Sequence, residues 1–211
     1  MDWVLTAKLF AALFAIMNPL STIPVFLALT ADATPPERRS AMLGMIATIT
    51  IGSLICAVAG QSLLSMFGID VNHFRLAGGL IVLLIALNML NGDESTAHHG
   101  TDKEQATFKS ATNVGIYPLG IPIAFGPGTM ATIIVFAQDA HGAGGLIPYY
   151  AGLIGYLVFF GILLAAAPLL AAWLSPTALS ISKRLMGIIL AAIAAEMIAG
   201  ALGKLFPAWL G

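Results

Sequence analysis

The chain has 211 residues, of which 59% are hydrophobic and 9% are charged, and its mean hydropathy is +0.94. Water-soluble domains carry roughly 25% charged residues, so this composition predicts an integral membrane protein. The net charge of −1 argues against nucleic acid as a partner. The single cysteine, Cys56, excludes an internal disulfide and a cysteine-based metal site, and we expect no cofactor.

The chain contains six apolar stretches long enough to cross a bilayer, which takes about 20 residues as a helix. In order they are 3–30, 41–69, 76–92, 110–138, 142–182 and 185–203. The first could also be read as a signal peptide, because Ala31-Asp32-Ala33 resembles a cleavage site. The chain begins with Met1-Asp2 rather than with a basic segment, however, which disfavours cleavage.

Charged residues are concentrated between the stretches and predict the orientation. The connections at 31–40, 93–112 and 174–184 hold six of the lysines and arginines, whereas the opposite side holds three, Lys8, Arg75 and Lys204. The positive-inside tendency therefore places the 93–112 linker in the cytoplasm and both termini outside it. The linker contains His98-His99, but adjacent histidines rarely converge on one metal ion, so we interpret it as a solvated connection.

Proline breaks interrupt the first and fourth stretches at equivalent places. "NPLSTIP" (18–24) and "GPGTMAT" (126–132) begin 108 residues apart. Proline removes a backbone donor and clashes with the carbonyl four residues back, and glycine permits backbone angles that other residues avoid. We therefore predict that both helices are discontinuous, at Asn18-Pro19 and at Gly126-Pro127-Gly128.

A second pair of segments supports an internal repeat. "RLAGGLIVLLIALNMLNG" (75–92) resembles "RLMGIILAAIAAEMIAG" (184–200) with a slip of one residue. Each half then holds three spans, and an odd number makes the second half enter the membrane in the opposite orientation. The predicted fold is an all-α membrane protein with two inverted three-helix repeats, at 1–92 and 113–211, joined by the 93–112 linker.

Two interpretations of the breaks remain. In transporters with inverted repeats, the site forms at the midplane between discontinuous helices, where unpaired backbone lines a cavity. The hydroxyls of Ser21, Thr22, Thr129 and Thr132 would then face a ligand. Alternatively, the prolines only shape helix packing, and the hydroxyls bond to carbonyls of their own helix.

These segments resemble the MarC family of bacterial and archaeal inner-membrane proteins, which includes carriers of small neutral amino acids. The resemblance rests on 18–30, 75–90, 118–134 and 184–198 and spans nearly the whole chain. It implies six helices in two inverted repeats, with substrate held where the first and fourth helices unwind. The residues to which it points are Asn18, Pro19, Ser21, Gly126, Pro127, Gly128 and Thr129.

The breaks suit a small zwitterion. A helix N-terminus offers amides and a partial positive charge to a carboxylate, and loosened carbonyls accept bonds from an ammonium. The first and fourth stretches contain no charge beyond Lys8, which favours glycine or alanine as the partner. A channel, an exporter of another small solute, and a structural or regulatory protein are the alternatives. An enzyme is disfavoured, because all four histidines lie in polar connections.

Glu196 is the only carboxylate well inside an apolar stretch. An ionised group there is expensive, so we expect it to face the protein interior or a water-filled cavity. It is a candidate for carrying a coupling proton, with a sodium ion as the other possible coupling ion, and Asn88 is its counterpart in the first half. The alternative is a protonated Glu196 that is hydrogen-bonded between helices.

Overall fold

The computed structural model describes residues 3–91, 114–143, 145–171 and 175–209, and every regular element in them is helical. The predicted linker lies outside the described residues. The first half contains α1 (Trp3–Met17), α2 (Pro19–Leu29), α3 (Pro35–Met66) and α4 (Val71–Asn91). The second contains η1 (Gly115–Ala124), α7 (Pro127–Ala143), α8 (Leu146–Ala165), α9 (Ala167–Ala171), α10 (Pro176–Leu205) and η2 (Pro207–Trp209).

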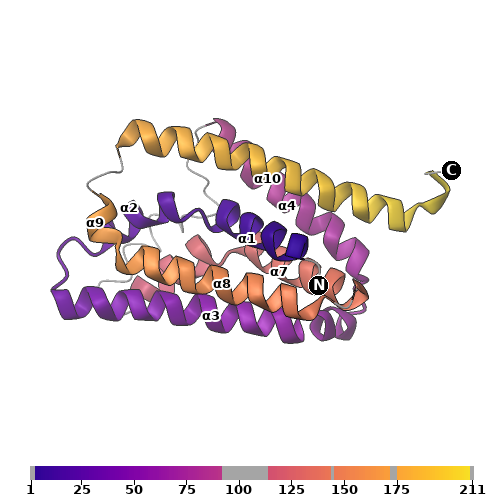
Figure 1. Cartoon of the computed structure of the whole chain (residues 1–211), viewed down its shortest axis with the longest axis horizontal. Coiled ribbons are helices and arrows are strands. Elements are labelled where there is room, and N and C mark those ends of the chain that lie inside the picture. The colour runs from indigo at the N-terminus through magenta and orange to yellow at the C-terminus, as the bar shows by residue number, and fades with distance from the viewer. Residues whose placement is uncertain (1–2, 92–113, 144, 172–174, 210–211) are drawn as a thin grey trace.

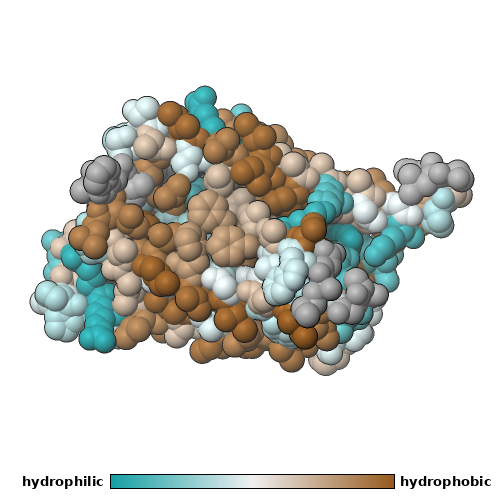
Figure 2. Space-filling model, viewed as in Figure 1, coloured by the Kyte–Doolittle hydropathy of each residue, from teal (hydrophilic) through white to brown (hydrophobic). Residues whose placement is uncertain are grey.

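The lengths and hydropathy of these helices confirm an all-helical membrane protein. Five segments can each span a bilayer by length and composition: 3–29, α3, α4, α8 and α10. A sixth span forms if η1 and the start of α7, which are bent by 62° relative to each other, count as one. Large apolar side chains such as Val58 and Ile162 project outward, and Figure 2 shows apolar residues over the middle of this face, with polar ones towards its ends.

Three helices start before the predicted apolar stretches, and one of them is α4, which begins at Val71 rather than at residue 76. We expected 31–40 to be a polar break, but α3 already begins at Pro35, where Thr34 and Glu37 form a capping box. The sixth span begins at Pro176 rather than near residue 185, because the Ser175 side chain accepts a bond from the amide of Ala178. In α3 and α10 a cap followed by proline at the first helical position starts a helix within polar sequence.

Three helix pairs position the centre of the molecule (Figure 1). The α1 helix packs on α8, with the rings of Phe10 and Tyr156 5.4 Å apart. The α3 helix packs on η1 and α7, where a Cβ at Gly115 would lie only 2.0 Å from the carbonyl oxygen of Ala41. The α4 helix packs on α10 through glycines, and such small residues let membrane helices approach closely.

Candidate functional site

The first break is a single residue. Asn18 separates α1 from α2 and has φ 36° and ψ 72°, a left-handed conformation that asparagine tolerates better than most residues. Its carbonyl oxygen accepts bonds from the amides of Ser21 and Thr22, both at 3.0 Å. Its side chain also accepts from the amide of Ser21, at 3.4 Å. Pro19, at the first position of α2, has no amide to satisfy.

The second break is longer and less regular. Within η1, Tyr117 and Ile121 have extended backbone angles, so this part of the span is not a continuous α-helix. At Gly126 the chain turns into α7, and the Gly126 carbonyl accepts a bond from the amide of Met130 at 3.1 Å. This bond is the counterpart, 108 positions on, of the Thr22–Asn18 bond at the first break.

The two breaks lie close together, because α1 packs against α7. A Cβ at Gly128 would lie 3.9 Å from the Cγ2 of Ile16, two residues before Asn18. The same Cβ would lie 2.9 Å from the terminal Cδ1 of Ile85 of α4, so a side chain here would displace the end of Ile85. Of the predicted site residues, Asn18, Pro19, Thr22, Gly126, Gly128 and Thr129 are buried, Ser21 is half-buried and Pro127 is exposed.

The threonine hydroxyls bond to the backbone across the breaks. The Thr22 hydroxyl donates to the carbonyl of Met17 at 2.9 Å, and the Thr129 hydroxyl donates to the carbonyl of Ala124 at 3.3 Å. These are the carbonyls that a break leaves without a helical amide. In this conformation the hydroxyls therefore cap the preceding segment. The Thr22 hydroxyl also lies 3.1 Å from the carbonyl oxygen of Asn18, one turn back, which is the kind of bond that the packing interpretation predicts.

Two further buried hydroxyls lie near the breaks, of which sequence reasoning singled out Thr132 but not Ser53. Ser53 of α3 and Thr132 of α7 are buried, and neither hydroxyl has a hydrogen-bond partner in the part of the chain that the structure describes. Ser53 follows Gly52, whose Cβ would contact the ring of Phe125 directly before the second break. No local sequence signal marks Ser53, because it lies in a long uncharged stretch whose contacts are set by tertiary packing.

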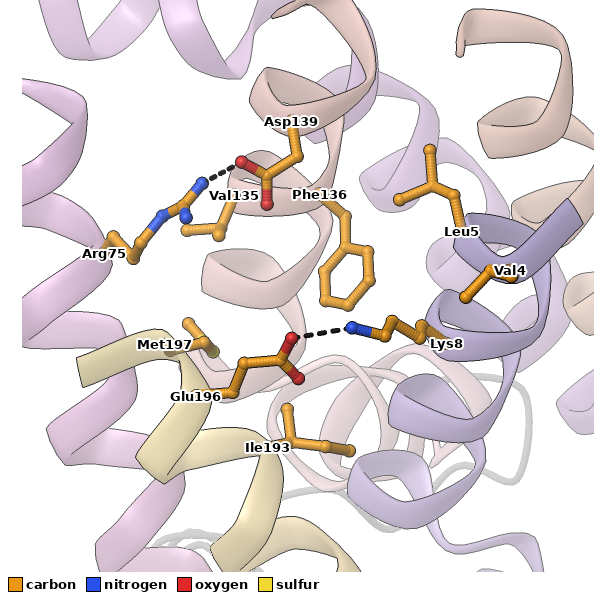
Figure 3. Close-up of a pocket in the computed structure, with 10 residues that line it drawn as sticks. All are labelled: Val4, Leu5, Lys8, Arg75, Val135, Phe136, Asp139, Ile193, Glu196 and Met197. Carbon is orange, nitrogen blue, oxygen red and sulfur yellow. Dashed lines mark hydrogen bonds and ion pairs between the residues drawn. The ribbon is translucent and has the colours of Figure 1, made fainter. Parts of the chain in front are cut away.

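A second polar feature lies at the end of the bundle where α1 begins. It is a cavity of about 190 Å³ at the meeting of α1, α4, α7 and α10 (Figure 3). Its charged lining residues are Lys8, Arg75, Asp139 and Glu196, and its apolar lining residues are Val4, Leu5, Val135, Phe136, Ile193 and Met197.

The charged residues of the cavity form two ion pairs. The Nζ of Lys8 lies 2.7 Å from a carboxylate oxygen of Glu196, and Arg75 pairs with Asp139. Only 9% of the Arg75 side chain is exposed, against 39% for Asp139. Arg75 and Asp139 fall just outside the apolar stretches predicted from the sequence, but both lie within helices, Arg75 in α4 and Asp139 in α7.

Glu196 lines this cavity and is paired rather than enclosed. Its side chain is 67% exposed, and that of Lys8 is 51% exposed. The partners lie 188 positions apart, so no sequence spacing indicates the pair. Its counterpart Asn88 is half-buried in α4 and is not part of the cavity lining. Whether Glu196 carries a proton stays a prediction.

Among the described residues there is no cluster of histidine, cysteine or acidic side chains that could hold a metal ion. The His98-His99 pair lies outside them.

Comparison with known proteins identifies the family. The model of "MarC family integral membrane protein" matches residues 3–206. The chain belongs to the MarC family. Its relatives include the UPF0056 membrane protein YhcE of Escherichia coli, 31% identical over 99% of this chain and 97% of the relative. The UPF0056 membrane protein YvbG of Bacillus subtilis is 32% identical over 94% of each. No solved structure matches this MarC chain.

Membership in the MarC family agrees with the helices described above. Both indicate a multi-pass integral membrane protein. The family extends to archaea, since the UPF0056 membrane protein MJ1677 of Methanocaldococcus jannaschii is 30% identical over 90% of the chain and 91% of that relative. The printed names of these relatives state a membrane protein and no substrate.

Proposed function

We propose that this MarC protein is a secondary transporter of small neutral amino acids such as glycine or alanine, which bind where the first and fourth spans are interrupted. The observation that carries the proposal is the proximity of two breaks within the buried interior, where α1 packs against α7 and Ile16, just before the first break, lies beside Gly128, just after the second. A backbone break in that position needs a reason, because unpaired polar groups there are costly.

An inverted repeat is part of the proposal, and the α4–α10 interface supports it. Gly79 and Gly187 are 108 positions apart, and side chains at these two positions would make equivalent contacts. Each residue contacted in the first half lies 108 positions before the one contacted in the second. A Cβ at Gly79 would meet Ala194, Met197 and Ile198, and a Cβ at Gly187 would meet Ala86, Met89 and Leu90. A two-fold relation between the halves produces such reciprocal contacts.

The chemistry of the breaks suits a zwitterion without charged side chains. Both α2 and α7 begin with a proline that has no amide, and the Ser21 amide already bonds to Asn18. The attraction for a carboxylate therefore comes mainly from the partial positive charge of each helix N-terminus. The carbonyls of Met17 and Ala124 lie before the breaks and accept bonds from hydroxyls. An ammonium group would compete for these acceptors, so Thr22 and Thr129 would turn towards the ligand when substrate binds.

Further parts of the proposal concern coupling and location. Glu196 is the candidate proton carrier, because it is an ionisable group in a polar cavity rather than in lipid. The protein would lie in the cytoplasmic membrane with both termini outside the cytoplasm, as the distribution of lysine and arginine indicates.

Uptake of labelled glycine and alanine into proteoliposomes tests the substrate site. We expect Asn18→Ala and Thr129→Val each to lower apparent affinity by roughly ten- to hundred-fold, because a lost hydrogen bond to a charged group costs about 1.5–3 kcal/mol. Thr48→Val is the matched control, since its hydroxyl makes an ordinary bond to the Gly44 carbonyl one turn back.

Unchanged transport constants in both break variants would remove the breaks from the site. Saturable uptake with stereoselective competition would support a carrier, whereas large single-channel currents in planar bilayers would show a channel instead.

A further inference from the structure

The charged cavity concentrates ionic groups that are scarce elsewhere in the chain. Each of its four charged residues comes from a different helix: Lys8 from α1, Arg75 from α4, Asp139 from α7 and Glu196 from α10. The two positive and two negative charges cancel. Each ion pair also joins the first half of the chain to the second, so the cavity lies on the boundary between the halves.

Structural stabilisation alone is a weak explanation for the Lys8–Glu196 pair. Both side chains are more than half exposed, and exposed ion pairs contribute about 0–1 kcal/mol. The pair is nevertheless held at 2.7 Å beside an apolar wall formed by Phe136, Ile193 and Met197. In Figure 3 the two ion pairs lie apart, with the ring of Phe136 between them in this view.

Each carboxylate can accept a further bond. One oxygen of Glu196 bonds to Lys8 and one oxygen of Asp139 bonds to Arg75, which leaves the second oxygen of each as an acceptor. The Lys8 ammonium is a positively charged group that attracts a carboxylate, and it carries three donors. A ligand with one charge would leave this balanced cavity with a net charge. A ligand with both charges keeps it neutral.

The volume also limits the ligand. The cavity of about 190 Å³ is large enough for a few water molecules, each of which takes about 30 Å³ in the liquid. A small amino acid with five or so heavy atoms is of this size, whereas a peptide or a nucleotide is much larger.

We propose that this cavity is a second ligand site, which binds a small zwitterionic amino acid with its carboxylate on Lys8 and its ammonium on the second oxygen of Glu196. The site is separate from the breaks. Lys8 precedes Asn18 by ten residues, or about 15 Å along α1 at 1.5 Å per residue. The cavity is therefore a vestibule at the end of the bundle where α1 begins. This inference rests on the charges of the cavity and does not require the proposed site at the breaks.

A thiol-protection experiment tests the site. Ile193 is a half-buried lining residue. Ile193→Cys in a Cys56→Ala background therefore places a single thiol in the cavity. We expect glycine to slow its reaction with a charged, water-soluble thiol reagent. At a concentration ten times Kd the rate should fall about tenfold, because the free fraction is 1/(1 + [L]/Kd). Val4→Cys, at a second lining position, repeats the measurement if Ile193→Cys does not fold.

Two comparisons identify the chemistry of the ligand. Acetate and methylammonium, which each carry one charge, should protect much less than glycine does. Lys8→Gln should abolish protection by glycine, and Lys8→Arg should retain it because it keeps the positive charge. Protection by acetate equal to that by glycine would overturn the zwitterion assignment and show a simple anion site.

The break variants separate this site from the proposed transport site. Protection should persist in the Asn18→Ala/Thr129→Val background. If it is lost there but kept in Lys8→Gln, glycine acts through the breaks and the vestibule site is overturned. If glycine protects no cysteine while proteoliposomes still take it up, the vestibule inference fails and the proposed function stands. If glycine protects the cysteine but is not taken up, the vestibule inference stands and the proposed transport function fails.

Discussion

Gly115 is the position where the backbone of η1 comes closest to α3. A Cβ there would lie 2.0 Å from the oxygen and 2.7 Å from the carbonyl carbon of Ala41, both backbone atoms that cannot rotate away. We expect Gly115→Ala to cost at least about 1–3 kcal/mol, the usual range for overpacking. Thermal unfolding of the purified protein in detergent measures this as a lower midpoint.

Gly155→Ala is the matched control at the residue scale. Gly155 also lies inside a membrane helix, but a Cβ there would meet nothing within 4 Å. Alanine favours a helix over glycine by up to about 1 kcal/mol, so this variant should unfold at the same or a higher temperature. Equal loss of stability in the two variants would contradict the close approach of η1 and α3.

At the residue scale, the sequence predicts where the helices break but not which side chains from different helices contact each other. Asparagine before proline is a local signal, and Asn18 does separate two helices with a left-handed conformation. The ion pair between Lys8 and Glu196 has no such signal, because its members are 188 positions apart and meet only when α10 packs on α1. The Ser53 hydroxyl, which has no partner among the described residues, has no sequence signal either, since its surroundings come from other helices.

At the scale of elements, hydropathy predicts the spans better than their ends. The six apolar stretches correspond to the five candidate spans and the bent pair of η1 and α7, because crossing a bilayer takes about 20 apolar residues. The starts of α3 and α10 lie inside segments predicted to be polar connections, since capping and proline extend helices beyond the apolar core. The sequence does not predict the extended backbone at Tyr117 and Ile121 within η1, although each of these residues precedes a proline, Pro118 or Pro122.

Helices α4 and α10 are counterparts in the proposed repeat, yet they differ at one polar position. Where α10 has Glu196 in the cavity, α4 has the neutral Asn88 outside it. If Glu196 carries the coupling proton, Glu196→Gln removes the titratable group and should abolish accumulation of substrate driven by a pH gradient. Exchange between preloaded vesicles should continue, because exchange needs no net proton movement.

The two transport assays together decide the role of Glu196. Loss of both accumulation and exchange in Glu196→Gln would show damage to substrate handling rather than to coupling. If the variant still concentrates substrate in response to a pH gradient, Glu196 is not the proton carrier.

At the scale of the whole molecule, the structure constrains the termini relative to each other. The start of α1 and the end of α10 lie at the same end of the bundle in Figure 1, as expected for an even number of crossings. The cavity with its four charges is at that end too, since Val4 and Lys8 line it. Which side of the membrane this end faces is predicted by loop charge alone, because helix packing is the same in either orientation.

The orientation itself is the last prediction. The connections at 31–40, 93–112 and 174–184 carry six of the nine lysines and arginines, so we expect them in the cytoplasm, with both termini and the charged cavity on the outer side. The test places a single cysteine either at position 99 or after the C-terminus, in a Cys56→Ala background, and labels intact cells with an impermeant thiol reagent. Only the C-terminal cysteine should react before lysis, and both should react after it. Reaction at position 99 alone in intact cells would invert the assignment and place the cavity on the cytoplasmic side.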